Sequence, residues 1–410
     1  MLLGVNVSAQ VIQAVGSRIG IQNAINAAPR GATIILPSGN ITFDKSVVIN
    51  NDVFIKGKGM SATIITSKIK GGYAFTIPRK SRKFVRISDL TVDGSNAGGG
   101  VYVVGDNFQF RIDNCTFRRC RTRAIETYGN AKGVIDHCTF TNNGITDIVV
   151  YGDNDASWNR PLTLGTDNAV YVENCKFTHS ASSGAWHSIG SNHGSRYVFR
   201  YNEIHDDAKL NTAPIDAHGN FEYGRGSRSY EIYNNSVFSG HSFQGIYIRG
   251  GTGVIFNNKL TGDFTYPIVL EDYRSFNKKG SRYYCESYPC IDQIQQLYIW
   301  NNTASGKNAV PYIQNRGLTR AHIKEGRDYF LQENRNYKPF TYPHPLTKGN
   351  LQFAQNPANG LDKGTTSRTI DNDEQESQSN CGTGVALALL IPIVIQSRKL
   401  KKRLSKKVNK

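Results

Sequence analysis

Histidine side chains cluster in one part of this chain. The sequence has nine histidines, and four of them fall between residues 187 and 218, namely His187, His193, His205 and His218. Two of these stand directly before a glycine, and Asp216 precedes His218 by two residues. Imidazole exchanges protons near neutral pH, which suits it to general acid–base catalysis. We interpret the stretch as a candidate catalytic site; the alternative is a solvated face that carries histidines by chance.

The histidines belong to a pattern that recurs in five segments, each ending at a glycine. The residues before the glycines form one column: Tyr128, Tyr151, His193, His218 and Arg249. The residues two positions earlier form a second column: Glu126, Val149, Ser191, Asp216 and Tyr247. The positions between them are apolar, so both columns should point outward from a strand. We call these two columns the strip, and Glu271 joins it from the next segment.

Loops with aromatic and basic residues flank the strip. Trp158 lies in the loop 153–167, Trp186 in the loop 179–187, and Arg225 and Arg228 in the loop 220–229. Such loops over a flat polar strip predict a groove for an extended sugar polymer. We expect Trp158, Trp186, Arg225 and Arg228 to contact it, together with Tyr128, Tyr247 and Glu271 of the strip.

A short repeated phrase predicts the architecture that positions these residues. Each copy is a strand of alternating apolar residues, a polar corner, and a second short strand. The second corner residues are Cys115, Cys138, Cys175, Asn202, Asn235, Asn258 and Asn302, at intervals of 23, 37, 27, 33, 23 and 44 residues. The apolar period of two excludes a helical repeat. A shortest period near 23 with variable insertions is typical of a β-solenoid.

Composition and charge are typical of an all-β chain with a basic surface. Forty glycines and only two methionines favour an all-β chain with many tight corners. The net charge is +17, and the segment 398–410 contributes eight basic and no acidic residues, which leaves 17 − 8 = +9 for the rest. A basic groove attracts polyuronates, sulfated glycans or nucleic acid, and a merely basic surface is the alternative.

The seven cysteines fall into separate groups. Cys115, Cys138 and Cys175 share one register of the repeat, so they should stack inward as small apolar groups rather than form disulfides. Cys285 and Cys290 lie five residues apart in a Tyr/Ser/Pro-containing loop and are candidates for a disulfide.

The two ends of the chain differ from the repeats. Residues 1–14 are a candidate remnant of a signal segment, and residues 351–380 read as a disordered linker rich in small and polar residues. Residues 381–410 combine a small-residue motif, a short apolar run and a basic end, as in a C-terminal sorting signal or membrane anchor. We therefore expect a protein outside the cell or at its surface, tethered to the membrane by its C-terminus.

The start of the solenoid carries a resemblance to a known superfamily. Residues 21–43 predict a short helix and then a first strand, which would cover the open end of a solenoid. This opening, the phrase Phe54-Ile-Lys-Gly-Lys-Gly and the Asn-Asn corners resemble the right-handed parallel β-helix proteins of the pectate-lyase-like superfamily. The resemblance spans roughly residues 15–345. It implies a single-stranded right-handed parallel β-helix with an N-terminal capping helix over residues 15–350. That superfamily includes lyases, hydrolases, epimerases and non-catalytic adhesins, so the resemblance names no activity.

The residue types of the strip favour elimination over hydrolysis. A lyase acting on a uronate needs a base at C5, a cation for the adjacent carboxylate, and an acid at the leaving oxygen. His193 or His218 can be the base, Arg249 the cation, and Tyr151 or the other histidine the acid. Hydrolysis needs two carboxyl groups about 5 to 10 Å apart. Asp216 and Glu126 should be about 14 Å apart, which is too far for hydrolysis, and Asp216 and Glu271 about 10 Å apart, which is marginal.

The sequence therefore predicts a lyase for an acidic glycan. A glycoside hydrolase of the same fold and a non-catalytic adhesion solenoid are the alternatives. Calcium is conceivable, but the strip offers no cluster of carboxylates such as calcium prefers, so the cofactor stays open. We expect no nucleic-acid partner, because no known reader motif is present. We also expect a monomer.

Overall fold

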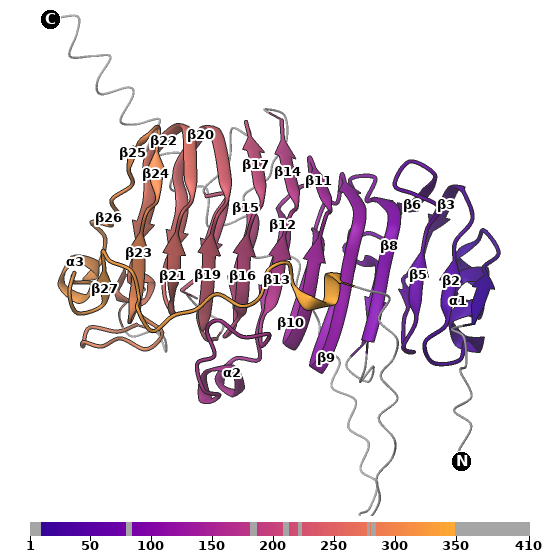
Figure 1. Cartoon of the computed structure of the whole chain (residues 1–410), viewed down its shortest axis with the longest axis horizontal. Coiled ribbons are helices and arrows are strands. Elements are labelled where there is room, and N and C mark those ends of the chain that lie inside the picture. The colour runs from indigo at the N-terminus through magenta and orange to yellow at the C-terminus, as the bar shows by residue number, and fades with distance from the viewer. Residues whose placement is uncertain are drawn as a thin grey trace, which may run out of the picture. The chain divides into compact units, whose positions relative to one another are not determined.

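The computed structural model describes residues 10–78, 84–180, 187–207, 213–219, 224–276, 279 and 284–348. Within these residues the chain winds through three ladders of parallel strands, and most coils give a strand to each ladder (Figure 1). All strands pair in parallel except β25 with β24. The fold is an all-β, single-stranded parallel β-helix, which confirms the predicted fold class.

The first ladder contains the strand before each corner. Its strands are β1 (Val11–Gln13), β2 (Thr33–Ile35), β5 (Phe54–Lys56), β8 (Phe84–Asp93), β9 (Gly99–Arg118), β10 (Arg123–Asp136), β13 (Val170–Glu173), β16 (Arg196–Arg200), β19 (Ser229–Tyr233), β21 (Thr252–Phe256), β23 (Leu297–Trp300) and β27 (Tyr329–Phe330). The long strands β8, β9 and β10 continue around corners, so they also contribute to other ladders.

The second ladder contains the strand after each corner. It consists of β3 (Gly39–Phe43), β6 (Thr63–Ser67), the ends of β8 and β9, β11 (Thr139–Thr141), β14 (Lys176–His179), β17 (Glu203–Asp206), the starts of β20 (Ser236–Ile248) and β22 (Lys259–Leu270), and β24 (Thr303–Ala304) with β25 (Lys307–Asn308).

The third ladder completes each coil. It consists of β4 (Val47–Val48), β7 (Tyr73–Ile77), the starts of β9 and β10, β12 (Thr146–Tyr151), β15 (His187–Asn192), β18 (Ile215–Ala217), the ends of β20 and β22, and β26 (Tyr312–Ile313).

The corner between the first and second ladders explains the repeated Asn residues. The first corner residues are Asn114, His137, Asn174, Tyr201, Asn234, Asn257 and Asn301, and all have φ between 48° and 56°. This left-handed conformation is unfavourable for most side chains, and asparagine tolerates it best after glycine. Local backbone geometry therefore selects Asn at this place in most coils.

The interior is built from aligned columns. On the third ladder, strand pairing stacks six isoleucines that are completely buried: Ile125, Ile148, Ile189, Ile215, Ile246 and Ile268. At the second corner position, Cys115, Cys138 and Cys175 are buried free thiols, as predicted. Further along, Asn202, Asn235, Asn258 and Asn302 replace them and bond to one another through their amides. The core is thus apolar over the first coils and contains a polar ladder over the later ones.

Short helices lie at the ends and in the loops. Helix α1 (Arg18–Ala27) is N-capped by Ser17 and buries Ile21 and Ile25 at the N-terminal end of the solenoid (Figure 1). This confirms the predicted capping helix. The remaining helical elements are α2 (Asp155–Asn159), η1 (Tyr273–Phe276), α3 (Thr319–His322) and η2 (Pro345–Thr347).

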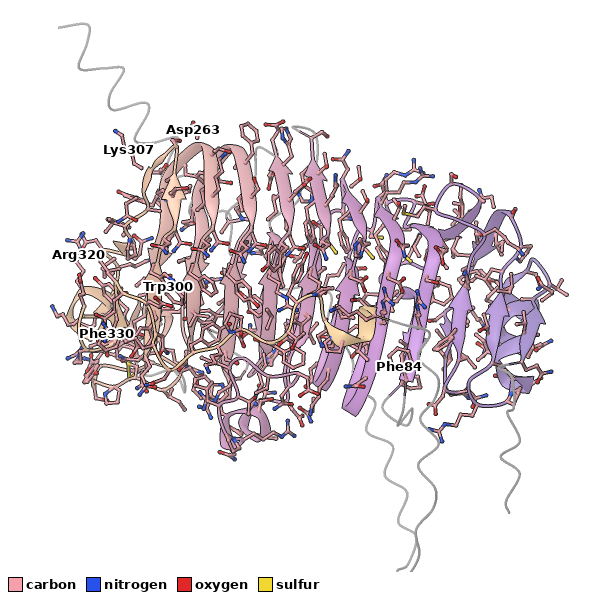
Figure 2. The ribbon with its side chains drawn as sticks, viewed as in Figure 1. Phe84, Asp263, Trp300, Lys307, Arg320 and Phe330 are labelled. Atoms are coloured by element: carbon pink, nitrogen blue, oxygen red, sulfur yellow. A yellow bond between two sulfur atoms is a disulfide. The ribbon has the colours of Figure 1, made fainter. Side chains whose placement is uncertain are left out.

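After β27 the chain returns along the first ladder. This segment, residues 337–347, is called the strap here, and it crosses β23, β21, β19, β16 and β13 before η2 reaches β10 (Figure 1). Arg200 donates to the carbonyl oxygens of Phe340 and Thr341, and Glu173 accepts from the His344 N–H. Beneath it Tyr233, Phe256 and Trp300 form a parallel aromatic stack, whose last member is labelled in Figure 2. The part of the first ladder from β10 to β23 is therefore covered by the chain itself.

Several predicted segments lie outside the described residues. They are the candidate linker 351–380, the C-terminal segment 381–410 and residues 1–9 of the candidate signal segment. Residues 11–13 of that segment form β1 and pair with β2. In the part of the chain that the structure describes, no helix combines the length and apolar character required to cross a bilayer.

Candidate functional site

The strip lies on the outer side of the third ladder. Strand pairing aligns Glu126 with Val149, and Asp216 with Tyr247, as expected from the columns. The isoleucines between these positions point into the core, so the strip residues point away from it.

At the coil that contains β15, the strand register differs by one residue from the register predicted by aligning the glycines. Aligning the terminal glycines placed His193 beside Tyr151, and Ser191 beside Val149, but the strands pair Tyr151 with Asn192 and Val149 with Gly190. His193 is an additional residue after the strand end and has a left-handed φ of 56°. Ser191 belongs to the inner side, where it is buried and its Oγ lies 2.8 Å from Ser227 Oγ.

His193 is held by the loop that follows β12. Its Nδ1 lies 3.1 Å from Asn154 Oδ1, and the same oxygen accepts the Arg225 backbone N–H at 3.2 Å. Because the amide of Asn154 must present its oxygen to that N–H, Nδ1 of His193 must be the protonated nitrogen. Burial lowers the pKa of His193 below its ordinary value. The ring is therefore neutral near pH 7 and has its lone pair on Nε2.

Tyr151 lies against His193 and next to a cation. The two ring centroids are 4.9 Å apart, and Tyr128 packs edge-on against Tyr151 at 6.4 Å. Arg123 donates to the Tyr151 hydroxyl at 3.2 Å and lies 3.3 Å from Glu126, which accepts from Tyr73. Burial raises the pKa of Tyr151, so the phenol is protonated at neutral pH. A neutral imidazole and a protonated phenol thus stand together.

Asp216 and Arg249 form a buried ion pair rather than an open polar surface. Arg249 Nη2 contacts both carboxylate oxygens of Asp216, at 2.9 and 2.8 Å, and Nε adds a bond of 3.1 Å. The guanidinium lies between the rings of Tyr247 and Tyr273, 4.7 and 4.6 Å from their centroids. Burial opposes both charges, but mutual attraction lowers the pKa of Asp216 and raises that of Arg249. The sequence predicts that Arg249 neutralises the carboxylate of the substrate. In the structure its guanidinium is already bound to Asp216, so it would have to perform that role from within this ion pair.

His218 lies beside this ion pair. Its ring meets Tyr273 edge-on at 4.9 Å, and its Nδ1 is buried without a hydrogen-bond partner. Burial, and then the charge of Arg249, lower the pKa of His218 well below its ordinary value. His187 is close enough to interact electrostatically with Asp216, and its Nδ1 lies 2.6 Å from the Ala213 carbonyl oxygen. Both rings are therefore neutral at physiological pH.

Glu271 lies at the next coil in a similar covered position. It is fully buried, accepts from the Tyr247 hydroxyl, and receives Arg316 Nε at 2.9 Å. Burial raises its pKa even though Arg316 opposes the shift. The two carboxylates considered for hydrolysis, Asp216 and Glu271, are thus both bound by arginines.

The loop residues predicted to contact a substrate gather around α2. Trp158 Nε1 donates to the Gly226 carbonyl at 3.0 Å, and the guanidiniums of Arg225 and Arg228 lie 4.5 and 4.9 Å from its ring. Arg225 also pairs with Asp292 at 2.6 Å and Asp155 at 2.7 Å. Trp186 lies outside the described residues. Loops from two separate coils therefore meet beside His193.

Five contributors to this region were not recognised in the sequence: Arg123, Asn154, Arg196, Tyr273 and Arg316. Arg123 lies three residues before Glu126 on the same strand, a spacing that the two-column pattern did not include. Asn154 and Tyr273 belong to loops directly after strip strands, which is a signal that could have drawn attention to them. Arg316 reaches the strip from 45 residues beyond Glu271, and nothing local indicates that.

Among the described residues, three side chains that could bind a metal lie close together outside the strip. Ligand atoms of Asp272, Cys290 and His322 lie within 4.8 Å of one another. Cys290, however, forms the predicted disulfide with Cys285, with a Cα–Cα distance of 5.7 Å, so it presents no thiolate. His322 Nδ1 lies 2.6 Å from Asp272 Oδ2. This group has the composition of a metal site only when the disulfide is reduced, and we assign no cofactor to it.

The fold and the comparisons agree on the class of protein. A family model described as right handed beta helix region matches residues 12–160. Together with the three parallel ladders, the match supports a right-handed parallel β-helix fold for this chain. No curated protein matches the chain in sequence at a significant level.

Comparison with solved structures finds similar chains at low sequence identity. The A-module of the mannuronan C-5 epimerase AlgE6 from Azotobacter vinelandii is 15% identical with a TM-score of 0.51, covering 74% of this chain and 91% of that one. The Streptococcus pneumoniae surface protein and adhesin PfbA is 15% identical with a TM-score of 0.49, covering 73% and 87%. ORF18 of Geobacillus virus E2 is 16% identical with a TM-score of 0.45. The match covers 73% of this chain but only 58% of ORF18.

Proposed function

We propose that this chain is a polysaccharide-active β-helix protein, and specifically a lyase that cleaves an acidic, uronate-containing glycan by β-elimination. The observation that carries the proposal is the contact between His193 and Tyr151. One ring is neutral with a lone pair on Nε2, and the other is a protonated phenol, with centroids 4.9 Å apart.

In the proposed reaction, each group performs one proton transfer. His193 Nε2 takes the proton from C5 of the uronate, and the electron pair of that C–H bond forms the C4–C5 double bond. The bond between C4 and the glycosidic oxygen breaks, and the Tyr151 hydroxyl gives its proton to the departing oxygen. Arg123, 3.2 Å from the Tyr151 oxygen, stabilises the phenolate that remains. Base and acid must act at adjacent carbons, which suits two rings in contact.

The charge of the chain supports an acidic substrate. Lysine and arginine outnumber aspartate and glutamate by 49 to 32. The described part of the strip offers no pair of free carboxylates, because Glu126, Asp216 and Glu271 are each bound by an arginine. This disfavours the two-carboxylate chemistry of glycoside hydrolysis.

We further propose that the protein acts outside the cell or at its surface. The Cys285–Cys290 disulfide supports an oxidising compartment. Tethering by the segment 381–410 remains part of this proposal, as does action as a monomer on a polymeric substrate.

The test is depolymerisation of a panel of polyuronates and sulfated glycans, monitored by ultraviolet absorbance of the unsaturated product. We expect absorbance to rise with the wild-type chain and to fall by at least ~100-fold in rate for His193→Asn and Tyr151→Phe. Asparagine keeps the left-handed backbone that this position needs. His137→Asn is the matched control, because His137 also has a left-handed φ, of 52°, at a corner away from the strip.

Other outcomes would contradict the lyase proposal in different ways. New reducing ends without absorbance would indicate a hydrolase. Retention of a glycan without any product would indicate an adhesin. Inversion at C5 without cleavage, detected by nuclear magnetic resonance of the polymer, would indicate an epimerase, because that reaction begins with loss of the same proton.

A further inference from the structure

Among the residues that the structure describes, two arginines near His193, Arg196 and Arg228, form no ion pair with a carboxylate within 4.0 Å. Arg196 Nη2 donates to the carbonyl oxygens of Ser157 and Arg160 at 2.8 and 3.4 Å, and Nη1 donates to Thr163 Oγ1 at 3.3 Å. Arg228 stacks on Trp158. In both residues Nε is buried and has no hydrogen-bond acceptor. The guanidinium of Arg196 is therefore held by neutral oxygens, and that of Arg228 by an aromatic ring, with Asp292 close enough to attract it electrostatically.

The neighbouring arginines, in contrast, each form an ion pair with a carboxylate. Arg225 is neutralised by Asp292 and Asp155, and Arg249 by Asp216. Arg196 and Arg228 belong to adjacent coils, since the Arg228 N–H donates to the Ser195 carbonyl at 2.9 Å. Only 9% of the surface of Arg196 is exposed. A cation that is nine-tenths buried beside a second cation is costly unless an anion joins them.

The electrostatics of the pair favour binding of an anion. Burial, and then the charge of Arg228, lower the pKa of Arg196 to about 10. Burial, and then the charge of Arg225, lower the pKa of Arg228. An anion placed between the two groups would reverse the repulsion and supply acceptors for the two Nε–H donors.

The pair adjoins the proposed reaction centre. Arg196 lines a small pocket together with Tyr151, Gly152, Ser157 and Gly194. Gly194 directly follows His193, and Tyr151 is the proposed acid. A ligand group bound by Arg196 would therefore lie next to both proton-transfer groups.

We propose that Arg196 and Arg228 form an anion subsite that binds the carboxylate of a uronate residue beside His193 and Tyr151. Trp158 and the carbonyl oxygens of Ser157 and Arg160 orient the two guanidiniums for this purpose. The substrate assignment rests on the proposed function, whereas the anion site itself does not. In this arrangement, Arg196 and Arg228 supply the cation that elimination requires, and Arg249 is a structural partner of Asp216.

The experiment measures binding of the full chain to uronate oligosaccharides by isothermal titration calorimetry. One probe carries free carboxylates, and a second is the same oligosaccharide as its methyl ester. We expect Arg228→Gln to weaken binding of the free acid by about tenfold, the size of one charge-assisted hydrogen bond. Arg335→Gln is the matched control, because Arg335 is exposed in the described chain. Arg228→Lys should restore part of the affinity.

The methyl ester separates a carboxylate subsite from general damage. We expect the wild-type chain to bind the ester more weakly than the free acid, and Arg228→Gln to cause no further loss. Equal affinity of wild type and Arg228→Gln for the free acid would overturn the proposal, and so would an equal loss for both probes. Failure of every uronate to bind, or a larger Arg228 dependence with a sulfated oligosaccharide, would also overturn it. Carboxylate-dependent binding without cleavage would uphold the subsite while the lyase proposal failed.

Discussion

Arg249 contacts both carboxylate oxygens of Asp216, and only 7% of Arg249 and 1% of Asp216 are exposed. Removing one partner leaves a buried, uncompensated charge. We therefore expect Arg249→Ala to lower the free energy of unfolding by about 3–5 kcal/mol, measured by urea denaturation. The double variant Asp216→Asn, Arg249→Met should recover much of that loss, because both charges are gone. If the single and double variants were equally unstable, packing rather than charge would explain the effect.

The bond between Asn154 and His193 should control the pH dependence of activity. Burial lowers the pKa of His193, so the acidic limb of the rate profile should lie below the ordinary histidine value. In Asn154→Asp, a carboxylate 3.1 Å from Nδ1 would stabilise the imidazolium and raise that pKa. We expect the acidic limb to move to higher pH by about one unit or more. Asn301→Asp, at an exposed corner, should leave the profile in place. An unchanged profile in Asn154→Asp would show that His193 is not the base.

The buried amide ladder should make a large contribution to stability. Asn235 donates to Phe199 O and Asn258 Oδ1, and its Oδ1 accepts from both nitrogens of Asn202. Asn235→Ala would leave several of these groups unpaired at about 1–3 kcal/mol each. We expect a loss of about 3 kcal/mol or more in the free energy of unfolding. The exposed Asn336→Ala is the control, and a loss no larger than that of Asn336→Ala would contradict the argument.

His179 predicts a loss of stability at alkaline pH. Its ring nitrogens lie 2.9 Å from Asp147 and 3.6 Å from Asp206, and all three groups are buried. Burial alone would lower the pKa of His179, but the two carboxylates outweigh it and raise the pKa to about 10. Because the folded pKa is above the unfolded one, this stabilisation is complete below about pH 6.5. It should disappear as the pH rises towards 10.

A thermal-denaturation series from pH 6 to pH 10 would test this. The midpoint of the wild-type chain should fall towards that of His179→Gln as the pH rises. A constant difference between the two proteins would show that His179 is not charged in the folded state.

The repeat and its interior follow from local rules that the sequence displays directly. Apolar residues at every second position require strands, and the left-handed corner selects asparagine in most coils, among them Asn114, Asn174 and Asn234. The buried isoleucines, the free Cys115–Cys138–Cys175 column and the short disulfide loop could likewise be predicted, because each depends on residues close in sequence or on the repeat itself.

The site depended on relationships that do not repeat. Glycine alignment placed His193 opposite Tyr151, and a single extra left-handed residue moved that register by one. The strip was expected to be open, yet Arg316 comes from 45 residues beyond Glu271 to pair with it. The partners of Arg225 are Asp155 and Asp292, which lie 70 and 67 residues away. Periodicity determines which side chains leave the core, whereas the non-periodic loops determine what those side chains meet, and only the folded chain brings those loops together.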